Sequence, residues 1–253
     1  MLWRKLQLNW RYAFGEFSII LLGVLAALAV DNWNSDKKDR FLEREYLLSL
    51  LDDFDADKKS LDNAMRRTEE IASAQQTVLM VAERRQFEIT PAEFVYALSE
   101  VGLLVFATPS RRTIDDLMST GNLRIIESDE VRTELVNYYS RIEHRAQWQH
   151  NWREYQIHLG KMLPEIINWQ GREALSFPDL SGLPPWVEPV DEVSQSEAQE
   201  ILDRLIAHPG VIPAIENMLR IQSINYQYNN ELKKRLSELT ETVEAYLGEL
   251  ENR

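Results

Sequence analysis

Apolar residues dominate one stretch near the start of the chain, "GEFSIILLGVLAALAVDNWN", residues 15–34. Fourteen residues from Phe17 to Val30 carry no charge. A straight helix needs about 20 residues to cross a bilayer, and the stretch reaches that length once the flanking aromatic residues are included. We therefore predict a transmembrane helix over residues 12–33, after a basic tail over residues 1–11. The residues predicted to anchor the helix at the membrane interfaces are Trp10, Tyr12 and Trp33.

Two other interpretations of the same stretch stay open. Ala27-Leu28-Ala29 satisfies the small-x-small rule of a signal-peptide cleavage site, and a basic region precedes the apolar run. A run of fourteen residues also suits a buried core helix. The aromatic residues at both ends favour the uncleaved membrane span, because interfacial belts need them there.

Glu16 stands at the entrance of the span, where a carboxyl group can reach the interface at moderate cost. Glu16, Ile20, Gly23 and Ala27 follow one another at spacings of four, three and four, and therefore share one helix face. Small residues on such a face let two helices approach closely in lipid. We predict a homo-oligomer through this face, although small residues are also common in spans that do not associate.

No Pro or Gly interrupts residues 35–86, so we predict a helix of about fifty residues that continues the span. Asp55 and Asp57 are followed by Lys58 and Lys59, a pattern that predicts a solvated face. The apolar positions recur at spacings of three, four and seven: Leu47, Leu50, Phe54, Leu61, Met65, Ile71, Val78 and Ala82.

N-capping residues then predict where several further helices begin. Thr90-Pro91-Ala92-Glu93 is a capping box that predicts a helix over 91–106. A short helix is expected over 110–120, before Gly121. Ser128 can cap a long helix over 129–169. The predicted buried stripe of that helix is Val131, Leu135, Tyr138, Ile142, Trp152, Tyr155 and Leu159.

Residues 171–193 are rich in Pro and Gly and predict an irregular loop, the natural place for a binding loop. Ser194 opens a further helix, and a last helix is expected over 213–250. Asn225 and Asn229 replace apolar residues in its upstream half, and such residues more often fix register than bind ligands. Its downstream half keeps a heptad spacing at Leu232, Leu236, Leu239, Val243, Tyr246 and Leu250.

These elements predict an all-α protein. The N-terminal transmembrane helix is expected to continue into an elongated antiparallel helical bundle formed by residues 34–253.

The net charge of −13, from 28 basic and 41 acidic residues, repels phosphate backbones. Nucleic-acid binding is therefore not expected. The chain has no cysteine, which excludes disulfides, thiolate zinc sites and cysteine nucleophiles.

The balance of Lys and Arg on the two sides of the span is nearly even, but the short basic tail is the easier side to retain. We predict a bacterial inner-membrane protein whose C-terminal domain faces outward. A cytoplasm-facing scaffold is the alternative.

Residues with metal-binding chemistry are few. His150, Glu154 and His158 share one helical stripe, but the outer pair lies about 12 Å apart and no His-Glu-x-x-His occurs. No Gly-x-Ser-x-Gly elbow or phosphate-binding loop is present. Neighbouring acids such as Asp52 and Asp53 point about 100° apart on a helix. We expect no cofactor and no enzymatic activity, with a metal-dependent enzyme as the alternative.

The span resembles that of an uncharacterised family of bacterial single-pass membrane proteins, in which a Gly-Glu pair opens the segment and Asn-Trp-Asn closes it. Here these residues are Gly15-Glu16 and Asn32-Trp33-Asn34. A second block, "TIDDLMSTGNLRIIESDEVRTELVNYY", is similar to another recurrent segment of that family. The resemblance implies an uncleaved span and no particular activity.

Pattern and resemblance together predict a membrane-anchored, non-enzymatic helical module for interaction or sensing. The expected partners are the lipid bilayer, a second copy of the chain and a protein not readable from the sequence.

Overall fold

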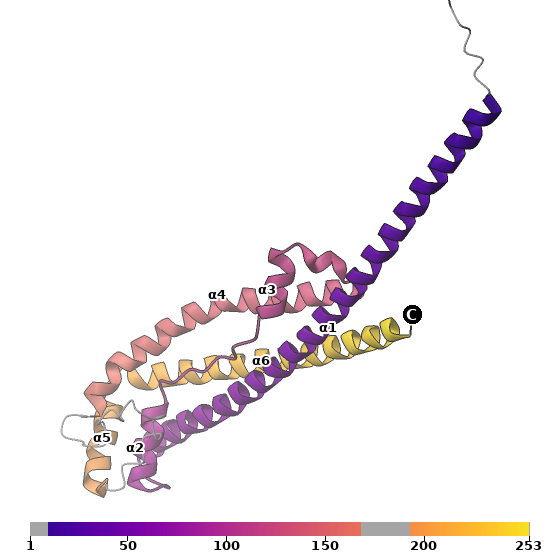
Figure 1. Ribbon diagram of the computed structural model, residues 1–253. Helices are drawn as coiled ribbons and strands as arrows, with labels where there is room; N and C mark the ends of the chain where they lie inside the picture. Colours follow the sequence, from indigo (N-terminus) through magenta and orange to yellow (C-terminus); the bar gives the residue numbers. More distant parts are fainter. Residues whose placement is uncertain (1–9, 168–192, 253) are drawn as a thin grey trace, which may run out of the picture.

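The computed structural model describes residues 10–167 and 193–252, except for the side chains of residues 10–13 and 251. Helix α1 (Trp10–Arg84) runs for 75 residues. Its first part projects alone, and the remainder enters an elongated bundle (Figure 1). The described residues contain no strand, and the predicted all-α fold with a long N-terminal helix is confirmed.

Two further long helices complete the bundle with α1. Figure 1 shows α6 running antiparallel to α1 and α4, with α2 and α5 at the far end and α3 beside the nearer part of α1. The helices after α1 are α2 (Pro91–Glu100), α3 (Arg112–Ser119), the 3₁₀ helix η1 (Asn122–Ile125), α4 (Asp129–Ile166), α5 (Gln195–Ala207) and α6 (Val211–Glu251).

The predicted N-caps are confirmed. The hydroxyl groups of Thr90, Ser128 and Ser194 each accept a hydrogen bond from the backbone N–H three residues later. At α2 the Glu93 carboxylate also accepts from the Thr90 backbone N–H at 2.8 Å, which completes the capping box. Each cap satisfies a backbone donor that the first helical turn leaves unpaired.

One stripe of buried residues on each of α1 and α6 follows an unbroken spacing of four and three along the whole bundle, so the apolar periodicity of the sequence marks the core. Asp53, Val81 and Ile221 are buried beside these stripes. On α1 they are Glu43, Leu47, Leu50, Phe54, Asp57, Leu61, Ala64, Thr68, Ile71, Gln75, Val78 and Ala82. On α6 they are Val211, Ile215, Met218, Gln222, Asn225, Asn229, Leu232, Leu236, Leu239, Val243 and Tyr246.

Three sequence predictions need correction or fall outside the described residues. Tyr155, predicted to be buried, is 48% exposed on α4. The helix predicted over 129–169 ends at Ile166. The loop predicted over 171–193 lies outside the described residues except for Val193.

The helix predicted over 91–106 is also wrong in extent, because α2 ends at Glu100. Residues 101–111, here called the strap, connect α2 to α3 without helical structure. Their backbone groups bond to side chains of α1 and α6, which compete with the helical hydrogen bonds that the apolar pattern favoured.

We expect Leu61→Ala to lower the free energy of unfolding by about 2–4 kcal/mol, because Leu61 is fully buried and the change leaves a cavity. Denaturation of the full chain in detergent, followed by circular dichroism, measures the change. Leu25→Ala is the matched control: Leu25 is 53% exposed on the projecting part of α1, so its truncation should leave bundle stability unaltered.

Candidate functional site

The first candidate region is the projecting part of α1. It contains an 18-residue window with a mean hydropathy of 1.9, none of it buried, which is long and apolar enough to cross a membrane. Glu16, Ile20, Gly23 and Ala27 are all exposed. A Cβ atom added at Gly23 meets nothing within 4 Å, so the predicted association face is open.

The predicted interfacial anchors are partly described. The Trp33 side chain is exposed, and the Lys37 ammonium group lies 3.9 Å from the centroid of its ring, a cation–π contact. The side chains of Trp10 and Tyr12 lie outside the described residues.

The second candidate region is the strap, which three amide side chains hold against the bundle. Gln75 on α1 donates to the carbonyl of Val101 at 2.7 Å. On α6, Gln222 donates to the carbonyl of Leu103 and Asn225 to that of Val105, each at 2.8 Å. Residues 101–102 form a turn, with Val101 in a helical conformation. From Leu103 onward, carbonyls two residues apart bond to the same helix, α6, which indicates an extended backbone, since that is the period of a strand.

Two buried carboxylates hold the other end of the strap. Asp57 accepts from the backbone N–H of Ser110 and from the Tyr138 hydroxyl at 2.7 Å. Asp53 accepts from the Ser110 hydroxyl at 2.9 Å and from the backbone N–H of Thr113 at 3.0 Å. The predicted solvated face is therefore wrong at Asp57, which is fully buried.

The two carboxylates differ in their electrostatics. Burial raises the pKa of Asp57 to about 6, against the hydrogen bonds from Ser110 and Tyr138. Burial acts on Asp53 in the same direction, but hydrogen bonds from Thr113 and Ser110, together with the positive charge of Arg112, bring the pKa of Asp53 below its usual value. Both groups are ionised at neutral pH and therefore hold backbone N–H groups as acceptors.

A buried guanidinium lies near the middle of the strap. Arg145 on α4 is 4% exposed and donates to the Oδ1 atoms of Asn225 and Asn229. Its Cζ atom lies 4.3 Å from the centroid of the Tyr228 ring and 6.0 Å from that of Phe106. Among the described residues Arg145 has no carboxylate partner, and burial lowers its pKa to about 10.

Near the start of the bundle, a third buried carboxylate holds another non-helical segment. Glu43 on α1 accepts from the backbone N–H of Glu127 at 2.7 Å and from the hydroxyl of Tyr246 at 2.8 Å. This carboxylate therefore joins α1 to α6 and to the residues that precede α4.

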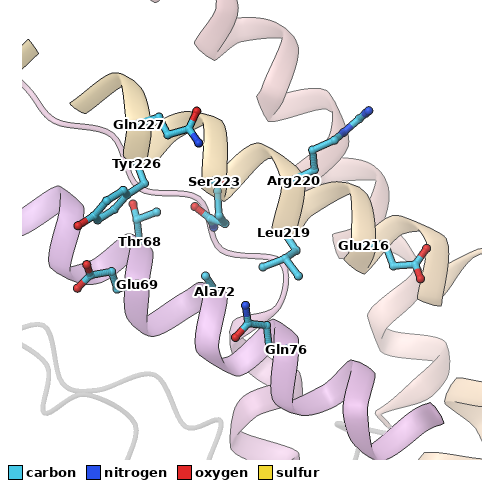
Figure 2. Close-up of a pocket in the computed structure, with 11 residues that line it drawn as sticks. Thr68, Glu69, Ala72, Gln76, Glu216, Leu219, Arg220, Ser223, Tyr226 and Gln227 are labelled. Carbon is cyan, nitrogen blue, oxygen red and sulfur yellow. The ribbon is translucent and has the colours of Figure 1, made fainter. Parts of the chain in front are cut away.

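A groove of about 840 Å³ lies between α1 and α6 (Figure 2). Ala72 and Leu219 form part of its apolar lining, and Tyr226 donates a hydrogen bond to Glu69 at one end. Gln222 also lines the groove while its amide group bonds to the strap, so the strap lies beneath the groove floor.

The candidate metal ligands His150, Glu154 and His158 are all exposed along α4. Within the described ranges, no three His, Cys, Asp or Glu side chains lie close enough to hold a metal ion.

The sequence identified Asn225 and Asn229 as polar positions of the core. It did not reveal that Gln75, Asp53 and Asp57 bond to the strap or to the start of α3, or that Arg145 bonds to the two asparagines. The available signal was the spacing itself: Gln75 and Asp57 occupy the same four-three register as the apolar residues of α1.

Comparisons with protein-family models, with curated proteins and with solved structures gave no match to this chain.

We expect Asp57→Asn to alter the pH dependence of stability. Because the folded-state pKa of Asp57 is raised, the folded chain binds this proton more tightly than the unfolded chain. The contribution of Asp57 is therefore most favourable below pH 4 and is lost as the pH rises through about 6. Asp57→Asn should remove this part of the slope in thermal unfolding measured from pH 4 to 7.5. The exposed neighbour Asp52, changed to Asn, is the control and should keep the wild-type slope.

We expect Asn229→Leu to lower the free energy of unfolding by about 2–4 kcal/mol, because it removes one of two acceptors from a buried cation. Adding Arg145→Met should recover most of that loss, since no unpaired charge is then buried. Urea denaturation of both variants measures the difference. The contrary result is that the losses of Asn229→Leu and of Arg145→Met, each measured alone, add up to the loss of the double variant. That result would show that burying an under-satisfied Arg145 charge does not cause the instability of Asn229→Leu.

Proposed function

We propose that this protein is a membrane-anchored, non-enzymatic helical module that holds an interaction surface at a fixed distance from the bilayer. The observation that carries the proposal is the continuity of α1, which runs without a break from an unpacked apolar segment into the bundle core. Burial in the bundle begins at Glu43, ten residues after Trp33, or about 15 Å of helix. An unbroken helix transmits position and rotation, whereas a flexible linker does not.

The compartment is part of the same proposal. We infer a bacterial inner-membrane protein with the N-terminus in the cytoplasm and the bundle on the outer side, because the short basic tail is the easier side to retain. The contact between Lys37 and Trp33 supports an interface at that end of the span, because an amphipathic ring and a snorkelling ammonium group are both favoured there.

Membrane anchoring and orientation are tested together. The full chain should stay with membranes after alkaline carbonate extraction, whereas a chain starting at residue 34 should be released. A C-terminal alkaline phosphatase fusion should be active if the bundle is exported. If a cytoplasmic reporter fused in place of the phosphatase is active instead, the protein is the cytoplasm-facing scaffold. If carbonate extracts the full chain from membranes, the proposed membrane anchoring is wrong.

We further propose that two copies associate through Glu16, Ile20, Gly23 and Ala27. The open surface at Gly23 supports close approach of a second helix. Energy transfer between labelled chains in liposomes measures the association, and Gly23→Leu should weaken it by about tenfold or more. Gly15→Leu is the matched control, since Gly15 is equally open but lies about 100° away from the stripe. Equal energy transfer in the wild type and Gly23→Leu would contradict association through this face.

A further inference from the structure

On its other edge, the strap has backbone N–H and C=O groups that find no hydrogen-bond partner among the described residues. The carbonyls of Val101, Leu103 and Val105 point toward the amide side chains of α1 and α6. In an extended backbone the groups of alternate residues point the opposite way. Those of Leu104 and Phe106 form no hydrogen bond with any described residue, and both residues are half-buried. An unpaired edge of this kind is a template for a further strand.

A groove runs beside this part of the strap. It has a volume of about 920 Å³ and is lined by α1, α2 and the strap itself, including residues 103–106. Tyr96 and Leu103 in its lining are 47% and 37% exposed. Side chains of an added strand alternate between two faces, so every second side chain of such a strand has a place to lie here.

The rim of the groove on α1 and α2 is neutral, with two arginines against two glutamates. Arg66 and Arg67 both pair with Glu70, and Arg67 also pairs with Glu100. These ion pairs satisfy the charges of the rim, so the rim itself does not select the charge of a ligand.

The positive charge of Arg145, which lies beneath the strap, favours a negatively charged ligand. Among the described residues, Arg145 has no carboxylate partner and its buried Nε atom has no hydrogen bond. Its guanidinium lies 6.0 Å from the Phe106 ring centroid. Asn225 bonds to both Arg145 and the carbonyl of Val105, so the charge is held directly against the strap. An uncompensated charge in a low-dielectric core attracts an anion over several ångströms.

We propose that the outer edge of the strap at Leu104 and Phe106 binds an extended, acidic segment of a partner protein as an added strand. A helical segment is less suited to this edge, because its backbone groups are already paired internally. The inference rests on the proposed function as an interaction module, for which it names the surface and the chemistry of the partner.

The test uses the full chain in lipid nanodiscs and a nine-residue peptide of alternating threonine and valine with a central glutamate. Isothermal titration calorimetry should detect saturable binding. N-methylation of all backbone amides of the peptide should weaken binding by about tenfold or more, because the peptide can no longer donate. Replacing the central glutamate by glutamine should weaken it by about threefold or more.

Variants of the chain locate the site. Leu104→Pro removes one outward N–H while its fixed φ suits an extended backbone, and it should weaken peptide binding by about fivefold or more. Val105→Pro is the matched control, because its N–H points inward and the edge stays intact. Thermal unfolding of both variants verifies that they are folded.

Three outcomes would overturn the proposal: no binding of the peptide at millimolar concentration to folded wild type, equal binding of the N-methylated peptide, or equal binding of the glutamine peptide. Each result leaves membrane anchoring and self-association untouched, since those depend on α1 outside the bundle. Failure of this inference is therefore distinguishable from failure of the proposed function.

Discussion

A segment without secondary structure, residues 101–111, packs against the helices of this bundle, and its partly buried backbone groups must find hydrogen bonds there. Side chains of α1 and α6 supply the partners: Gln75, Gln222 and Asn225 donate to backbone carbonyls of the strap, and Asp57 accepts from the backbone N–H of Ser110. Removing any one of them leaves a buried backbone group unpaired, which costs more than the bond itself contributes. Gln75, Gln222, Asn225 and Asp57 are therefore polar residues of the core that serve the strap.

The same constraint links the core to the surface. Carbonyls on one edge of the strap are bonded from within, which holds the half-buried opposite edge at Leu104 and Phe106 in an extended form. Asn225 is shared between the strap and Arg145, so the position of the backbone and the position of the buried charge are coupled. Packing, hydrogen bonding and electrostatics here are parts of one arrangement, and changes in neighbouring members are not expected to be additive.

The length of α1 determines how the bundle relates to the apolar segment. A helix without Pro or Gly through residues 35–86 has no built-in hinge, and its buried register begins at Glu43. Whatever fixes the apolar segment in space therefore also fixes the direction in which the bundle extends. This makes α1 a rigid spacer, and it places the strap well away from the apolar segment (Figure 1).

The sequence by itself determined the local elements. Periodicity and caps identified the apolar span, the long helices and the starts at Thr90, Ser128 and Ser194, because these depend on neighbours a few residues apart. Only the tertiary structure decided whether polar residues in the helices and in the strap are buried or exposed. Asp57 has the local pattern of a solvated acid, and residues 101–106 have that of a helix. Asp57 is buried, and residues 101–106 leave the helix, because partners 26 to 120 residues apart along the chain meet in space and complete their hydrogen bonds.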